Sequence, residues 1–185
     1  MALMNRQGQD READSATEKN VAESVFPDDE SKKATERAMA LLLHKDRTEH
    51  ELTVKLRKAE YSDEAVSFAV EYVRKYGYID DLRYAKSYIE LHIGNMSRRQ
   101  IRQKLFERGV SDEIVSEAFS AYEETDETGV DPEETAMNLL IRKRLRGRSI
   151  SDLTYEEKQK QMRYLAGKGF PTEMIRRAFL DGRDE

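Results

Sequence analysis

The chain has 185 residues, of which 37% are charged and 38% hydrophobic, and it carries a formal net charge of −5. With only 9 glycines and 3 prolines, this composition favours a helical protein with a thin, distributed core over a thick two-layer α/β fold. The absence of cysteine excludes disulfides and thiolate chemistry. No apolar stretch approaches the roughly 20 residues that span a bilayer, and the first residues lack the pattern of a signal peptide. We therefore expect a cytoplasmic protein.

The acidity belongs to the first 30 residues. They hold 3 basic and 8 acidic side chains, so the rest of the chain carries 29 of each sign, because 32−3 and 37−8 both equal 29. Their apolar residues follow no sustained period, and Pro27-Asp28-Asp29 ends the segment. We therefore predict that residues 1–30 form a disordered acidic tail.

Helical periodicity predicts nine helices in the remainder of the chain. Asp131-Pro132 with Glu134 is a typical helix start, with a capping aspartate and a proline in the first helical position. Gly77, Gly94 and Gly109 fall where left-handed caps at helix C-termini are expected. The predicted helices lie near 34–45, 48–59, 62–76, 81–93, 97–108, 111–123, 132–146, 154–168 and 171–181.

One pattern occurs three times in the chain. LRKAEYSDEAV (56–66) matches LFERGVSDEIV (105–115) at an offset of 49, and LAGKGFPTEMI (165–175) follows after a further 60. Each copy starts with leucine, and a second helix begins at a serine or proline six residues later. Three ordered copies indicate repeated units of three helices, each with a small core. We predict an all-α fold of three tandem three-helix repeats in an elongated, curved array. The predicted divisions are the tail (1–30), repeat 1 (31–79), repeat 2 (80–124), and an acidic linker with repeat 3 (125–185).

The helix–turn–helix outline of residues 105–119 raises the possibility of DNA reading. A DNA-reading helix enters the major groove by its N-terminal end. Here the corresponding helices begin with Asp63-Glu64, Asp112-Glu113 and Thr172-Glu173. Carboxylates in a first turn stabilise the helix dipole but repel phosphate, so we expect these helices to be structural. A sequence-specific DNA-binding regulator remains the alternative hypothesis.

Enzyme chemistry is not indicated. The chain has no GxxxxGK[ST], GxGxxG, GxSxG or HExxH pattern. The three histidines lack metal-ligand spacing, and Asp80-Asp81 stands where a helix cap is expected. We therefore expect no catalytic residues, no metal site and no cofactor.

Two basic clusters are the candidate binding sites. Arg98 and Arg99 stand at a helix N-terminus, where the dipole disfavours cations, so their placement suggests a use other than helix stability. The second cluster follows the acidic stretch 123–134, which offers neutralisation as a competing explanation. Solvated helix faces are the alternative for both clusters, and phosphate or an acidic partner is the functional interpretation. The candidate residues are Arg98, Arg99, Arg102, Lys104, Arg142, Lys143, Arg144, Arg146 and Arg148.

GYIDDLRYAKSYI (77–89) and MSRRQIRQKLFERGVSDEIV (96–115) resemble the signature of the bacterial RecX regulatory proteins. RTEHELTVKLRKAEYSDEAV (47–66) and LAGKGFPTEMIRRAF (165–179) resemble the flanking repeats, so the resemblance covers about residues 34–182. It implies a cytoplasmic, non-enzymatic protein that binds the RecA recombinase filament on single-stranded DNA. It further implies inhibition of the RecA ATPase and of strand exchange, and thereby modulation of recombination, DNA repair and the SOS response. The acidic tail and the acidic linker depart from the family pattern.

The partners expected from this resemblance are RecA, in the groove of its filament, and single-stranded DNA, contacted directly or through RecA. We expect no membrane association and a monomeric chain. An inert helical scaffold is a further alternative, but the unequal offsets of 49 and 60 count against a regular solenoid.

Overall fold

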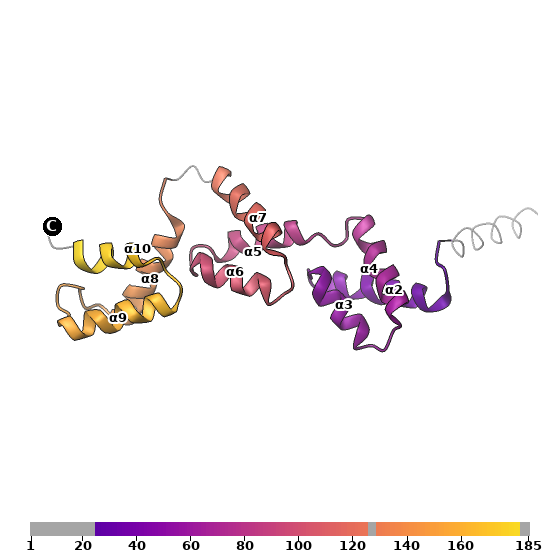
Figure 1. The fold of residues 1–185 in the computed structure, drawn as a ribbon, viewed down its shortest axis with the longest axis horizontal. Helices are drawn as coiled ribbons and strands as arrows, with labels where there is room; N and C mark the ends of the chain where they lie inside the picture. The colour runs from indigo at the N-terminus through magenta and orange to yellow at the C-terminus, as the bar shows by residue number, and fades with distance from the viewer. Residues whose placement is uncertain (1–24, 126–128, 182–185) are drawn as a thin grey trace, which may run out of the picture. The chain divides into compact units, whose positions relative to one another are not determined.

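The computed structural model describes residues 25–125 and 129–181. Within them the chain forms nine α-helices and no strand, which confirms the predicted all-α fold (Figure 1). The helices are α2 (Asp29–His44), α3 (Glu49–Arg57), α4 (Asp63–Lys75), α5 (Asp81–His92), α6 (Arg98–Phe106), α7 (Asp112–Thr125), α8 (Pro132–Leu145), α9 (Tyr155–Gly167) and α10 (Thr172–Arg176), followed by the π-helical turn η1 (Arg177–Asp181).

The start of α2 and the end of α5 differ from the prediction for physical reasons. Helix α2 begins at Asp29 rather than at residue 34, because the Asp28 carboxylate caps it by accepting a hydrogen bond from the Ser31 N–H at 2.6 Å. Asp28 therefore starts a helix instead of ending a tail. The predicted left-handed cap at Gly94 is wrong: α5 continues through right-handed Ile93, and the left-handed glycines include Gly77 and Gly109 but not Gly94. The remainder of the predicted disordered tail, residues 1–24, lies outside the described residues.

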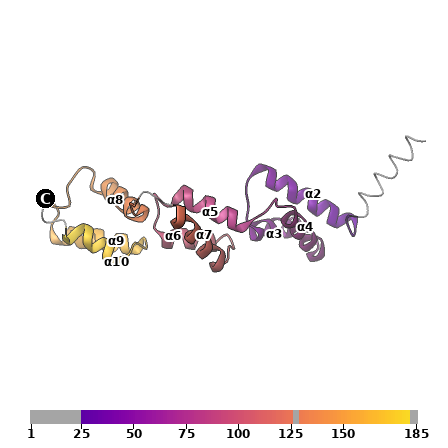
Figure 2. The ribbon, with the colours of Figure 1, turned by 90° about the horizontal axis from the view of Figure 1, so that it is seen from above.

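The described residues form two compact units. The first falls in Met1–Asp46 and Glu51–Ile79, and the second in Arg47–His50 and Asp80–Glu185. Figure 2 shows the helices of each unit from a second direction. The predicted elongated, curved outline and the predicted domain limits stay predictions.

Each three-helix repeat has its own core, built around the leucine of the repeated pattern. Leu56, Leu105 and Leu165 are all at most 1% exposed. In the first two repeats the first and third helices pack together, α2 on α4 and α5 on α7. The fully buried alanines Ala69 and Ala118 lie on these third helices, and their small side chains permit this close packing. The tandem three-helix architecture predicted from the repeats is confirmed.

The turn after this leucine has two hydrogen bonds in common in all three repeats. In each, two successive N–H groups donate to carbonyls three residues earlier, and the second donor has a positive φ. That donor is Glu60 (φ 63°) in the first repeat, Gly109 (φ 79°) in the second and Gly169 (φ 88°) in the third. Since Glu60 adopts this conformation, the backbone alone does not require glycine. Close packing does: a Cβ on Gly109 would lie 2.2 Å from the His50 Cβ, and one on Gly169 would lie 2.9 Å from the Arg99 Cβ.

We predict that Gly109→Ala destabilises the protein by about 2 kcal/mol more than Gly147→Ala, because only the first adds an overpacked contact. Gly147 also has a positive φ, of 92°, but a Cβ there would meet no atom within 4 Å, so its replacement reports the backbone strain alone. Urea unfolding followed by circular dichroism measures both variants. Equal losses would contradict the close approach of His50 to Gly109.

Candidate basic cleft between α6 and α9

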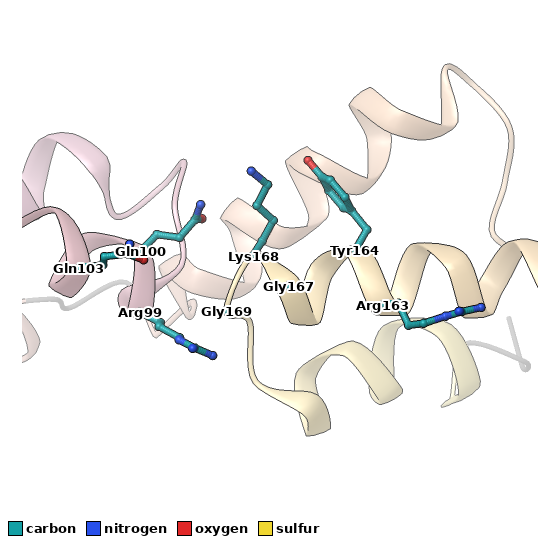
Figure 3. Close-up of a pocket in the computed structure, with 8 residues that line it drawn as sticks. All are labelled: Arg99, Gln100, Gln103, Arg163, Tyr164, Gly167, Lys168 and Gly169. Atoms are coloured by element: carbon teal, nitrogen blue, oxygen red, sulfur yellow. The ribbon is translucent and has the colours of Figure 1, made fainter.

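A cleft of about 400 Å³ lies between α6 and α9, both within the second unit (Figure 3). Three cationic side chains, two glutamines and one tyrosine line it, and none of its described lining residues is acidic. The lining residues are Arg99, Gln100, Gln103, Arg163, Tyr164, Gly167, Lys168 and Gly169. Such a lining suits an oxyanion, because guanidinium, ammonium and amide groups all donate hydrogen bonds.

Ser97 lies at the start of α6 and connects the two sides of the cleft. Its hydroxyl accepts from the Gln100 N–H at 3.1 Å, and its own N–H donates to the Gln100 side chain at 3.4 Å. This capping box starts α6. The same hydroxyl donates to the Lys168 carbonyl, at 2.7 Å, just beyond the end of α9. Ser97 is completely buried, so the position of α6 relative to α9 is fixed by an internal hydrogen bond.

Glu133 in α8 makes a second tie to α6. The Glu133 residue is 4% exposed, and its carboxylate accepts from the Arg98 N–H at 2.9 Å and pairs with the Arg98 Nε at 3.6 Å. Burial raises the pKa of Glu133, while the hydrogen bond and charge of Arg98 oppose that shift. Glu133 belongs to the acidic stretch 123–134, so part of that acidity has a structural role.

The first predicted basic cluster divides into paired and unpaired side chains. The Arg98 guanidinium also pairs with Glu123. Arg102 pairs with Asp112 at 3.1 Å and stands 5.0 Å from the centre of the Phe119 ring. Lys104 contacts Glu107 at 2.7 Å, and the pKa of Glu107 is lowered, mainly by this hydrogen bond. Arg99 differs: it lines the cleft and has no carboxylate partner among the described residues.

The second predicted cluster lies at the end of α8 and divides in the same way. Arg144 donates to Gln161 at 2.7 Å, and its guanidinium lies 3.7 Å from the centre of the Tyr164 ring. Arg148 binds the Glu157 carboxylate through two nitrogens, at 2.9 and 3.2 Å. The other three members are exposed and have no ion pair within the part of the chain that the structure describes. They are Arg142, Lys143 and Arg146.

Sequence reasoning missed the α9 side of the cleft. Arg163 and Lys168 have no carboxylate partner in residues 25–125 and 129–181. Arg163 donates to the Gln159 carbonyl at 3.3 Å, and the Lys168 ammonium lies 5.7 Å from the Tyr164 ring centre. The repeated pattern could have pointed to Lys168. This residue directly precedes the glycine of its turn, and a basic residue, Arg108, stands at the same position in the second repeat. The approach of this turn to Arg99 is a tertiary contact that the pattern does not encode.

We predict that Arg148→Ala raises the pKa of Glu157, which is now held at about 2, mainly by the hydrogen bond from Arg148. The pKa should remain below the ordinary 4.5, because the Thr154 N–H still donates to the same carboxylate. A carboxylate with a depressed pKa stabilises the fold above its unfolded pKa, and this stabilisation is lost as the pH falls from about 4.5 to about 2. Carbon-detected NMR titration measures the shift, with Glu107 as internal reference. An unchanged Glu157 pKa would contradict the Arg148–Glu157 pair.

None of the helices in the described residues is long and apolar enough to cross a membrane. Those residues also contain no group of three or more histidine or acidic side chains that could hold a metal ion.

Comparison with known proteins identifies the family. Residues 34–72, 80–118 and 131–179 match the first, second and third three-helix domains of RecX. The regulatory protein RecX of Vibrio vulnificus is 35% identical over 145 residues, which cover 78% of this chain and 89% of that protein. The RecX of Caldanaerobacter subterraneus is 33% identical over 150 residues, covering 80% and 70%.

The fold is also that of a solved structure. The crystal structure of RecX from Lactobacillus salivarius matches with a TM-score of 0.68 at 23% identity, over 83% of this chain and 96% of that chain. The three matched domains and the relatives together show that this chain belongs to the RecX family of regulatory proteins.

Proposed function

We propose that this protein is a non-catalytic, cytoplasmic regulator of the RecA recombinase. It binds the RecA filament on single-stranded DNA as a monomer, and it inhibits ATP hydrolysis and strand exchange without a cofactor. Membership of the RecX family supports a regulatory role. The partner and the direction of the effect come from the resemblance of residues 77–115 to the signature of that family.

The observation that carries the proposal is the unpaired charge of the cleft. Arg99, Arg163 and Lys168 lie together without a described carboxylate partner. Cations are normally matched or solvated apart from one another, because like charges repel. Three of them around one hollow are suited to phosphates or carboxylates of the filament. We assign the first contacts to these three side chains and to Arg142, Lys143 and Arg146.

The remaining predicted contacts have partners inside the protein. Each makes an ion pair or donates a hydrogen bond within the second unit, so we propose that these side chains chiefly maintain the local structure. They are Arg98, Arg102, Lys104, Arg144 and Arg148.

We expect the triple variant Arg99→Ala, Arg163→Ala, Lys168→Ala to need about tenfold more protein for half-maximal inhibition of the RecA ATPase, because it loses several charge contacts of about 0.5 kcal/mol each. The measurement is ATP hydrolysis by RecA on single-stranded DNA, titrated with each protein. The loss should shrink as salt is added.

The matched control removes three cations elsewhere. Lys33, Arg57 and Arg176 take part in exposed ion pairs, so their replacement by alanine changes the net charge equally. A lack of inhibition by the unmodified protein would reject the proposed function. Equal effects of the two triple variants would instead reject the cleft and assign the loss to net charge.

A further inference from the structure

An exposed phenylalanine continues the line of cleft residues along α6. Arg99, Gln103 and Phe106 are spaced i, i+4, i+7 and therefore share one face of the helix. Arg99 and Gln103 line the cleft, and Phe106 is 75% exposed. A single exposed apolar side chain is common on protein surfaces. Its alignment with an unpaired arginine is the feature that suggests binding.

The fold does not require an aromatic residue at this position. Phe106 follows the buried Leu105, and the residues that follow the corresponding leucines are Arg57 in the first repeat and Ala166 in the third. Both of these are exposed as well. Three chemically different side chains thus occupy the same outward position, so the core of the repeat leaves its identity free.

The wall of the cleft formed by α9 contributes positive charge, and Tyr164 is its only large apolar side chain among the described lining residues. Arg163 and Lys168 line the cleft from α9 and the turn that follows it. The Arg163 side chain extends along α9 away from α6, and its Nε donates to the Gln159 carbonyl (Figure 3). The nearby acids are committed elsewhere: Glu133 to Arg98, Asp112 to Arg102, and Glu107 to Lys104. The surface therefore combines a positive hollow with an aromatic side chain further along the same helix face.

We propose that the cleft and Phe106 together dock a segment of a partner protein that carries a carboxylate and an apolar side chain. This inference rests on the proposed function in taking a RecA filament as the partner. Seven residues of α-helix place Arg99 and Phe106 about 10 Å apart. Three residues of extended chain, or two turns of helix, span the same distance. A partner of either conformation can therefore place its carboxylate in the cleft and its apolar side chain on Phe106.

Nucleic acid could occupy both features only with groups from different nucleotides. A phosphate in the cleft carries its base through a single sugar, which is a shorter link than the distance from Arg99 to Phe106. The phosphate of one nucleotide and its own base would therefore not occupy both features. Stacking of a base on Phe106 is the outcome that the experiment must separate from protein docking.

The test compares Phe106→Ala with Leu91→Ala, a matched control that removes a 71% exposed apolar side chain from α5 of the same repeat. The two probes are RecA filaments on oligodeoxythymidine with a slowly hydrolysed ATP analogue, and the oligonucleotide alone. Binding of each full-length variant is measured by fluorescence anisotropy. Because truncation of a buried aromatic anchor weakens an interface strongly, we expect Phe106→Ala to bind the filament about tenfold more weakly, and Leu91→Ala to bind it as the unmodified protein does.

The salt dependence of binding distinguishes the apolar contact of Phe106 from the charged contacts of the cleft. The loss caused by Phe106→Ala should be the same at low and high salt, whereas the loss caused by Arg163→Ala should shrink as salt screens the charge. Unchanged filament binding by Phe106→Ala overturns this inference and leaves the proposed function standing. Equal weakening of binding to the bare oligonucleotide also overturns it, in favour of base stacking. A lack of filament binding by the unmodified protein rejects the proposed function, and this inference with it.

Discussion

The second unit depends on one kind of hydrogen bond. A buried hydroxyl at the start of a helix donates to a backbone carbonyl in the turn of the following repeat. Ser97 donates to the Lys168 carbonyl at 2.7 Å, and Thr48 donates to the Arg108 carbonyl at 2.5 Å. Both hydroxyls are fully buried. Each contact has a carboxylate beside it, since Asp81 accepts from the Glu49 N–H and Glu133 from the Arg98 N–H, both at 2.9 Å. Backbone N–H groups in the first turn of a helix have no partner within that helix, and here the neighbouring helices supply their acceptors.

This arrangement decides which charges are available. Glu133 caps α6 from the neighbouring repeat and is buried, and the adjacent Arg98 is its counterion. Arg98 is therefore used inside the protein. Arg99, one residue further along, lies on a different face of α6 and passes over Gly169 into the cleft. The same junction thus neutralises one arginine and leaves the next one open to an anionic partner.

The repeats and the helices could be predicted from the sequence because they depend on local chemistry. Each copy of the repeated pattern starts with a leucine, and Leu56, Leu105 and Leu165 are all buried. Capping by Asp80 is confirmed, since its carboxylate accepts a hydrogen bond from the Arg83 N–H at 3.0 Å. The start of α2 was missed because the aspartate that caps it stands just after a proline, and Pro27-Asp28 also matches a turn signal.

The candidate site was predictable only in part. Clusters of arginine are visible in a sequence, but which of them meet a carboxylate depends on contacts between residues far apart, such as Arg98 with Glu133. Arg163 was missed because α9 mixes acidic, basic and uncharged polar residues, so its sequence shows no basic cluster. The acidic starts of α4 and α7 act as expected for structural helices, with Asp63 paired to Arg57 and Asp112 to Arg102.

Glu60 shows what glycine contributes to a repeated turn. The turn of the first repeat keeps the left-handed conformation with a full side chain in place, whereas the turns at Gly109 and Gly169 have a neighbour packed against the Cα. In this chain, glycine occupies this position in the two turns where a neighbouring side chain packs against the Cα. A side chain that packed on Glu60 as closely as His50 packs on Gly109 would collide with the Glu60 Cβ, so the same close packing at the first turn would require glycine.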